Sequence, residues 1–510
     1  MPGTDEPSTC TIIPPHCGRL CFDIRKITAA ATALSSPSIT QRWRISPHKR
    51  SIAREFRVII LCDTLARNPV AAPVRASLDG FTLRWTYDIT RRPRVPLSIK
   101  DLMPSDLEFQ MFVLDELADE LSNKGADVVK LTIGVSELPI PPNVLERMIG
   151  KLRDPDFVRR VYPEGLPELR EAIAEFYNKR YTANVSFENV IVNTGSSPIF
   201  RNIFQLLAGP EFEIMIPRPY YALYLYCAKL AGAKVKFYDI DVHSKRVDMD
   251  SFRRNFSPER TSLVVINSPG NPIGNIVTPD EMRQMYEIVD HNAYVLNDEI
   301  YNNTMFYDQF HTPLAALPQH KDITIVTNSF SKGYRMYTKR VGFAILPEEL
   351  QRNLRVMQQH TLLCTDPCYQ DGMIAALEDE ESPRELNRLF RSRAEYTTQR
   401  LEGTGCKPVA AEGGFYAMLR CKDWNAAHGF ASSKELARDI LEKVHVAVVP
   451  GTDFGVPHDL RLAFCNDRYK DGIDRLHKYF TTAAISQSTN RSTAAAVSVE
   501  SPKSAESADA

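Results

Sequence analysis

Buried strands and amphipathic helices alternate along the central part of the chain. Short runs of β-branched and other apolar residues, typical of strands covered on both faces, recur between residues 128 and 346. The predicted strands are 128–134, 189–193, 213–216, 233–238, 263–267, 293–297, 323–327 and 341–346. Helical spacing fills intervals such as 168–177 and 221–230. This alternation predicts an α/β fold with a mostly parallel sheet flanked by helices, and a site in the loops at the carboxyl ends of the strands.

The remaining stretches divide the chain into segments. Residues 1–98 are rich in Arg, Ser, Thr, Ala and Pro without a sustained period, so we expect a leader that is disordered or carries a targeting signal. Residues 151–347 are expected to form a large domain, and residues 99–150 and 348–483 a smaller α+β domain. Residues 484–510 are mostly Ser, Ala, Thr and Glu, which predicts a disordered tail because so little apolar surface cannot offset the ordering entropy.

Composition narrows the classes of function. The chain has 510 residues, 43% hydrophobic and 25% charged, with a formal net charge of −1. Balanced charge favours small-molecule chemistry over a nucleic-acid or membrane partner. The 10 cysteines are scattered without a CxxC pair, which predicts reduced thiols and no metal site. We expect a cytoplasmic protein, or a mitochondrial one if the leader is a transit peptide; the apolar runs are too short to cross a bilayer.

Two cations stand out between the last two predicted strands. Lys332 follows the strand at 323–327, and Arg340 lies eight residues later, just before the strand at 341–346. Lysine condenses with aldehydes, best where its surroundings lower its pKa, and arginine grips a phosphate with two parallel hydrogen bonds. The pair would suit a phosphorylated aldehyde, although a lysine after a strand is more commonly a solvated loop residue.

Other predicted strands end in candidate ligand loops. Residues 194–198, Thr-Gly-Ser-Ser-Pro, follow one strand and begin a helix, where free N–H groups and the helix dipole favour an anion. Three further loops, at 267–274, 297–301 and 459–464, read Asn-Ser-Pro-Gly-Asn-Pro-Ile-Gly, Asn-Asp-Glu-Ile-Tyr and Asp-Leu-Arg-Leu-Ala-Phe. Each loop alone is weak evidence, but their order along the chain is informative.

Taken in order, these motifs resemble those of the fold-type I pyridoxal-phosphate aminotransferases of class I/II, the aspartate aminotransferase superfamily. The similarity extends over about residues 101–483 and rests on N-P-x-G at 271–274, D-x-x-Y from Asp298 to Tyr301, S-x-S-K at 329–332, the arginine eight residues after the lysine, and Arg461. It implies a homodimeric enzyme that uses pyridoxal phosphate to move an α-amino group from an L-amino acid to a 2-oxo acid by a ping-pong mechanism.

The resemblance also implies a role for each matching residue on the cofactor side. Lys332 is similar to the lysine that forms a Schiff base with the cofactor and then moves the Cα proton. Asp298 is similar to the carboxylate that keeps the pyridine nitrogen protonated, and Tyr301 and Asn271 to the pair that hydrogen-bonds the phenolic oxygen. The residues that match the phosphate ligands are Gly195, Ser196, Ser329 and Arg340.

Further matches concern ring stacking, the substrate and the neighbouring subunit. Tyr221 resembles the aromatic residue that stacks on the cofactor ring, with Tyr220 as an alternative. Arg461 resembles the fork that receives the substrate α-carboxylate, assisted by Asn271 and the backbone around Gly134. Tyr162 resembles the tyrosine that reaches the phosphate of a neighbouring subunit.

Several alternatives remain open at this point. The cofactor-side motifs do not separate transamination from the lyase, decarboxylase or aminocyclopropane-carboxylate-synthase-like reactions of the same fold. A non-catalytic regulator is another alternative, although residues 1–98 contain no helix-turn-helix pattern, and keeping both Lys332 and Arg461 favours turnover. Thr338 departs from the glycine that many relatives have there, and no second arginine for a side-chain carboxylate is evident, so a narrow aspartate specificity does not follow.

Overall fold

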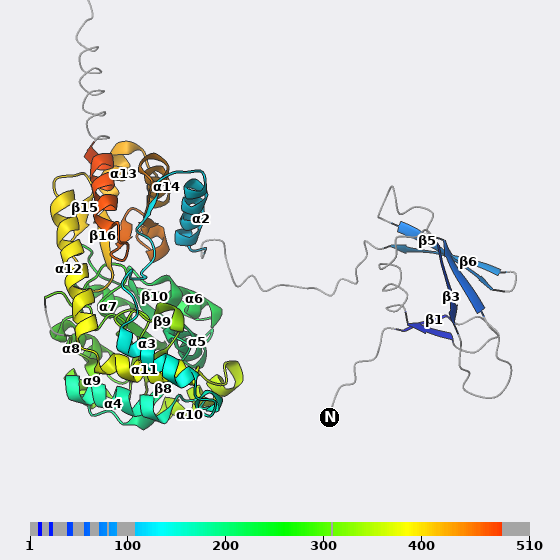
Figure 1. Cartoon of the computed structure of the whole chain (residues 1–510), viewed down its shortest axis with the longest axis horizontal. Coiled ribbons are helices and arrows are strands. Elements are labelled where there is room, and N and C mark those ends of the chain that lie inside the picture. The colour runs from blue at the N-terminus through cyan, green and yellow to red at the C-terminus, as the bar shows by residue number, and fades with distance from the viewer. Residues whose placement is uncertain are drawn as a thin grey trace, which may run out of the picture. The chain divides into compact units, whose positions relative to one another are not determined.

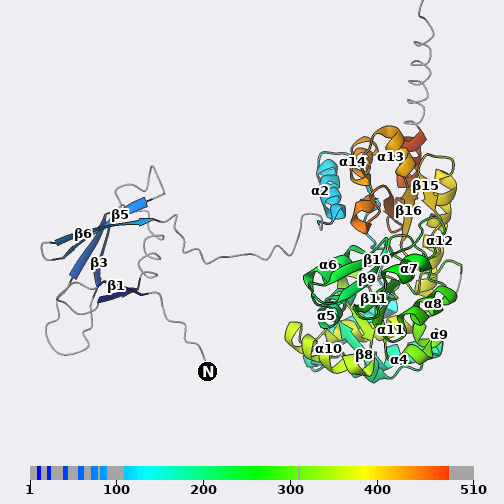
Figure 2. The same ribbon diagram turned by 180° about the vertical axis from the view of Figure 1, so that it is seen from behind.

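The computed structural model describes residues 108–307 and 310–481, and gives strand positions within the first hundred residues. The chain divides into two compact units, Met1–Asp101 and Leu102–Ala510 (Figures 1 and 2). No helix in the described part is both long and apolar enough to cross a membrane. The predicted disordered tail at 484–510 lies outside the described residues.

Strands in the first unit pair as antiparallel hairpins. The pairs are β1 (Thr9–Ile12) with β2 (Leu20–Asp23), β3 (Ser38–Trp43) with β4 (Phe56–Leu61), and β5 (Ala71–Leu78) with β6 (Phe81–Asp88). No regular element was expected here, because these residues show no sustained period. The overlooked signal is clearest in β6, where Phe81, Leu83, Trp85 and Tyr87 alternate with polar residues. The predicted leader, residues 1–98, otherwise falls outside the described residues.

A seven-stranded sheet forms the core of the second unit. Its order is β10-β9-β11-β12-β13-β14-β8, and β14 runs antiparallel to both of its neighbours while the other described pairs are parallel. The strands are β8 (Val190–Asn193), β9 (Glu213–Arg218), β10 (Lys234–Asp239), β11 (Thr261–Asn267), β12 (Tyr294–Asp298), β13 (Thr324–Ser329) and β14 (Gly342–Ile345). The predicted α/β fold with a mostly parallel sheet is therefore confirmed.

Helices cover both faces of this sheet (Figures 1 and 2). Alternate residues of β11 pack into different cores, Leu263 and Val265 on one face and Val264 and Ile266 on the other. The first face is covered by α5 (Ser196–Leu207), α6 (Ala222–Leu230) and α10 (Glu348–Thr361). The opposite face is covered by α3 (Pro142–Leu152), α4 (Pro167–Tyr181), α7 (Met249–Asn255), α8 (Pro279–Val289), α9 (Pro313–Ala316) and α11 (Pro367–Glu378).

A smaller α+β layer combines distant parts of the chain. Its antiparallel sheet has the order β15 (Lys407–Val409), β16 (Tyr416–Arg420), β19 (Leu460–Ala463), β18 (Val449–Pro450). Its helices are α2 (Gln110–Asn123), α12 (Glu381–Leu401), α13 (Lys422–His428) and α14 (Ser433–Val444), and β7 (Val129–Lys130) pairs with β17 (Val446–Ala447). Leu114, Val129 and Leu131 share one apolar core with the carboxyl-terminal elements.

Three helices, α3, α10 and α11, pack against the large sheet, although the predicted boundaries at 150 and 348 assign most of their residues to the smaller domain. Val144 and Met148 of α3 and Met373 of α11 lie in a core against the large sheet, and so does Leu354 of α10. Their apolar stripes are complementary to the sheet rather than to the smaller layer. The boundaries themselves remain a prediction.

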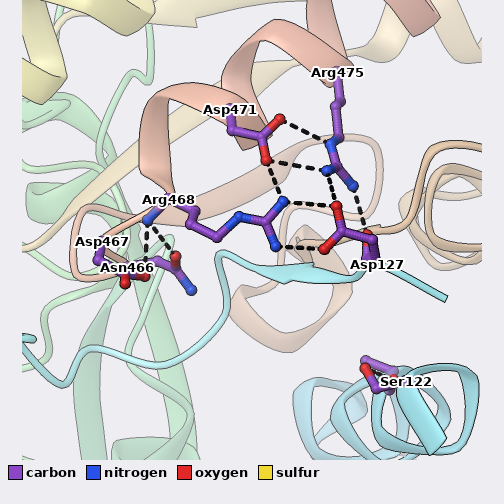
Figure 3. Close-up of polar contacts among 8 residues, drawn as sticks. Ser122, Asp127, Asn466, Asp467, Arg468, Asp471 and Arg475 are labelled. Atoms are coloured by element: carbon purple, nitrogen blue, oxygen red, sulfur yellow. Dashed lines mark hydrogen bonds and ion pairs between the residues drawn. The ribbon is translucent and has the colours of Figure 1, made fainter. Parts of the chain in front are cut away.

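Charged side chains also join the two parts of the chain that form the smaller layer, the segment before β7 and the segment after β19. Asp127 accepts hydrogen bonds from Arg468 at 2.6 Å and Arg475 at 2.5 Å, and Asp471 pairs with the same two arginines (Figure 3). The two guanidinium groups hold the pKa of the Asp127 carboxyl well below its usual range. Asp127 is exposed and its partners are only half-buried, so solvent screens the cluster and it contributes little to stability.

Candidate active site

Lys332 lies where the carboxyl end of β13 turns towards β14. Its Nζ donates a hydrogen bond to the Gly134 carbonyl at 2.7 Å, and lies 4.8 Å from the centre of the Tyr337 ring and 5.5 Å from that of Phe415. Gly134 belongs to the segment after β7 (Val129–Lys130), so the lysine links the end of β13 to that segment. A side chain on Gly134 would overlap the Tyr416 hydroxyl and crowd Lys332, which explains the glycine.

Asp298 ends β12, the strand beside β13, and is buried at 3% exposure. It accepts a hydrogen bond from the Tyr224 hydroxyl at 2.5 Å and one from the Ile300 backbone N–H at 3.2 Å. Burial raises the pKa of Asp298 to about 6, although the Tyr224 hydrogen bond opposes the change. Both donors are uncharged, so this carboxylate is prepared to receive a cation from a ligand.

A chain of polar contacts leads from Tyr301 to the arginine on β19. The Tyr301 hydroxyl lies 3.5 Å from the Tyr416 hydroxyl, and the Tyr416 ring lies 4.2 Å from the Arg461 guanidinium. Arg461 donates to Asn271 Oδ1 at 3.3 Å. The loops predicted to carry the site therefore converge in the structure.

Arg461 is a buried cation at 2% exposure. It donates to the Thr132 carbonyl at 2.6 Å, packs on the Phe454 ring at 4.8 Å, and its Nε has no hydrogen-bond partner among the described residues. None of the ion pairs within the described part of the chain includes it. A buried guanidinium with unused donors is suited to bind a ligand carboxylate in two parallel hydrogen bonds.

An anion cradle surrounds the start of α5. Gly195, at φ +84°, precedes the helix, and a Cβ there would overlap the Arg340 guanidinium. Arg340 is exposed and donates to the Ser331 hydroxyl at 3.1 Å, and the Ser329 hydroxyl donates to Ser331 at 2.8 Å. Ser196 is the first helical residue, so its backbone N–H also faces this region.

The two adjacent tyrosines before α6 have different surroundings. Tyr221 lies edge-on to Tyr224 with centroids 5.6 Å apart; burial, then Tyr416 and Asp298, raise its pKa. Tyr220 instead stacks on Phe237, with centroids 5.6 Å apart. The geometry thus favours Tyr221 over the alternative as the residue that lines the site.

Tyr162 has no described contact with another predicted site residue. Its side chain is 37% exposed, and its ring faces the Arg160 guanidinium at 5.2 Å. Its assignment to a neighbouring subunit remains a prediction.

Sequence reasoning missed three residues that line the site. Tyr224 bonds Asp298, Tyr416 bridges Tyr301 and Arg461, and Ser331 joins Ser329 to Arg340. Tyr224 lies one helical turn after Tyr221, and Ser331 is inside the S-x-S-K motif, so both could have been found by spacing.

A second buried acid, Glu299, directly follows Asp298. It is 1% exposed and accepts hydrogen bonds from Thr312 at 2.6 Å and Tyr177 at 2.9 Å. Burial is the main cause that raises its pKa to about 8, and the charge of Asp298 acts in the same direction. Glu299 is therefore held as a neutral acid near pH 7.

Glu299→Gln is expected to flatten the pH dependence of stability. A carboxyl whose pKa rises on folding contributes fully to the free energy of unfolding at pH values below its unfolded pKa of about 4.3. This contribution is lost as the pH rises towards the folded pKa of about 8. Between pH 5 and 8 the free energy of unfolding of the wild type should fall by on the order of a few kcal/mol, and that of the glutamine variant should not. Denaturant unfolding at several pH values measures this. Glu171→Gln, at an exposed position of α4, should keep the wild-type slope; equal slopes for Glu299→Gln and wild type would contradict the neutral acid.

The fold and the site together define an enzyme of the aminotransferase type. The family model for aminotransferase class I and II matches residues 126–476. The aspartate aminotransferase of Bacillus subtilis is 28% identical over 369 residues, which cover 71% of this chain and 93% of that protein. The asparagine–oxo-acid transaminase of Streptococcus mutans is 28% identical over 372 residues, covering 71% and 94%.

Solved structures show the same relationship. The aspartate aminotransferase of Thermotoga maritima superposes with a TM-score of 0.67 at 28% identity, covering 75% of this chain and 99% of that one. That of Thermus thermophilus with maleate gives a TM-score of 0.67 at 26% identity, covering 74% and 97%. The chain belongs to the aminotransferase class I and II family. It is an enzyme, a transaminase, as the sequence predicted, and the regulator alternative finds no support.

Proposed function

We propose that this transaminase binds pyridoxal phosphate through Lys332 and moves an α-amino group from an L-amino acid to a 2-oxo acid by a ping-pong mechanism. The observation that carries the proposal is the convergence of three groups from different strands. Lys332 follows β13, the buried carboxylate of Asp298 ends β12, and the buried guanidinium of Arg461 belongs to β19. When bound, the cofactor supplies an aldehyde that accepts the amino group and a ring that accepts the electron pair left at Cα.

The residues present fit this cofactor. Arg340, the start of α5 and the Ser329–Ser331 hydroxyls form an anion site of the kind that holds a phosphate. Asp298 is a buried carboxylate whose described donors are uncharged, so a protonated ring nitrogen would satisfy it. Tyr221 offers an aromatic face, and Tyr301 with Asn271 offers hydrogen-bond groups for a ring oxygen.

Lys332 and Arg461 have the two remaining roles in the proposed reaction, proton removal and binding of the substrate carboxylate. Lys332 would hold the cofactor through its Nζ, and once free the same amine would remove the proton from the substrate Cα. Arg461 and the Gly134 backbone hold the α-carboxylate, which fixes the Cα–H bond towards the lysine.

Arg461→Ala is expected to weaken substrate binding more than cofactor binding. A charge-assisted hydrogen bond contributes roughly 1.5–3 kcal/mol, so kcat/KM should fall at least about tenfold for any α-amino acid, while the bound cofactor remains. Arg468→Ala, at a surface arginine in the smaller layer, is the matched control. An unchanged KM and kcat/KM would mean that the α-carboxylate is held elsewhere.

The substrate is not restricted to aspartate in this proposal, although several relatives are named aspartate aminotransferases. Arg393 of α12 already pairs with Glu137 at 2.6 Å, and Arg335, in the loop after β13, pairs with Glu385 at 2.7 Å. Neither is therefore free to bind a second substrate carboxylate without breaking an ion pair.

An assay of the purified enzyme against a panel of L-amino acids with 2-oxoglutarate tests the reaction. We expect amino transfer to 2-oxoglutarate with parallel-line kinetics for at least one donor. Release of ammonia or carbon dioxide that does not depend on the oxo acid would instead support the lyase or decarboxylase alternative.

A homodimer is part of the proposal because apolar side chains are exposed around Tyr162. Leu152, Val158 and Val161 are 53%, 43% and 53% exposed. Such a surface is typical of a face covered by a second copy, and it would bring Tyr162 towards the partner's phosphate. Analytical ultracentrifugation should give twice the chain mass; a monomer with full activity would contradict the shared site.

A further inference from the structure

Two buried cysteines face each other at the edge of the smaller sheet. β15 and β16 pair antiparallel with Lys407 opposite Arg420, which puts Cys406 opposite Cys421 at the next register position. Both are 0% exposed, and burial, then the neighbouring Cys406 thiol, raise the pKa of Cys421. Opposed residues of antiparallel strands have Cα atoms about 4.5–5.5 Å apart, which falls inside the range of about 4.4–6.8 Å found for disulfides.

We propose that Cys406 and Cys421 form a reversible disulfide that fastens the edge strand β15 to β16. In the described part of the chain both are free thiols, and they are the cysteines that a strand register brings together. The proposal concerns a modification site outside the active site and does not depend on the substrate.

An oxidant can reach this pair from the sheet edge. β15 is the outermost strand and has only three residues, and Cys406 is flanked by exposed Gly405 and Lys407. Short edge segments with few buried contacts open locally at low free-energy cost. Opening of β15 exposes Cys406, while Cys421 stays between β16, which pairs with β19, and the start of α13.

The chemistry is thiol–disulfide exchange with a small disulfide of the glutathione type. The Cys406 thiolate attacks one sulfur of the oxidised glutathione, and the displaced glutathione thiolate takes up the proton that Cys406 lost. Before β15 closes again, the Cys421 thiolate attacks the Cys406 sulfur and displaces the second glutathione, whose thiolate takes up the proton that Cys421 lost. The protein loses two hydrogens, and one oxidised glutathione becomes two reduced ones. Burial raises the pKa of Cys421, so the closed form reacts slowly and opening sets the rate.

The disulfide would restrain the sheet that carries part of the site. β16 begins at Tyr416, and its Met418 lies opposite Arg461. Closing a loop of about 15 residues reduces the conformational freedom of the unfolded chain. Oxidation is therefore expected to raise the Tm by a few degrees.

Equilibration of the full-length protein in a series of glutathione redox buffers tests the proposal. After alkylation and digestion, mass spectrometry should find a peptide that links Cys406 to Cys421, lost on treatment with dithiothreitol. Cys406→Ser and Cys421→Ser should lack both the link and the Tm rise; alanine variants replace either one if it does not fold. Cys227→Ser, at another buried thiol, should behave as wild type. Free thiols at both positions in every buffer, or an unchanged Tm in a linked protein, would overturn the proposal.

Discussion

Replacing Lys332 by alanine is expected to remove nearly all turnover and the visible absorbance of the lysine-bound cofactor. A Schiff base with the aldehyde requires a primary amine, and Lys332 Nζ lies between the Gly134 carbonyl and the aromatic rings that line the site. The same amine is also the proposed base, and a placed base is typically worth roughly 10²–10⁴-fold. The loss should therefore exceed that of any other single substitution proposed for the site.

Lys339→Ala is the matched control for this experiment. Lys339 lies seven residues after Lys332, and its ammonium faces the Tyr369 ring at 5.5 Å instead of the site. The control should keep the absorbance and the activity. If the Lys332 variant also kept both, the covalent attachment would have to be assigned to another lysine.

The large sheet could be predicted because its strands are buried on both faces. Residues 263–267, for example, are almost continuously apolar, and such runs separated by helical spacing are typical of parallel sheets. Lys332 and Asp298 could be located for the same reason, since each directly follows one of these strands. The observed register puts Asp298 opposite Thr327, near the carboxyl ends of β12 and β13.

Contacts between side chains far apart in sequence could not be predicted in this way. The Tyr224 hydroxyl reaches Asp298 across 74 positions, and Tyr301 meets Tyr416 across 115. Periodicity describes which face a residue occupies, but not which residue of another element it meets. The helices α3 and α11 show the same limit, because helical spacing predicts that one face of each is buried but not that the large sheet buries it.

Asp298→Asn tests how the carboxylate helps the cofactor ring to accept electrons, and tests this more directly than it tests cofactor binding. The substitution removes a buried negative charge while nearly preserving its shape, and Tyr224, which donates to the carboxylate at 2.5 Å, can still donate to the amide oxygen. A protonated ring nitrogen would lose its counter-charge, and breaking a buried ion pair costs about 3–5 kcal/mol. Part of that cost should appear in the barrier to removal of the Cα proton.

The expected loss in kcat is on the order of 10²–10⁴-fold, at about 1.4 kcal/mol for each factor of ten. Lys332 should still hold the cofactor, so the visible absorbance remains. A substrate deuterated at Cα should give a larger isotope effect than in the wild type, because proton removal becomes rate-limiting. Tyr224→Phe, which removes one neutral hydrogen bond but keeps the charge, should cost much less. A near-wild-type kcat with an unchanged isotope effect would mean that Asp298 is a structural carboxylate, and that another group compensates the charge on the ring.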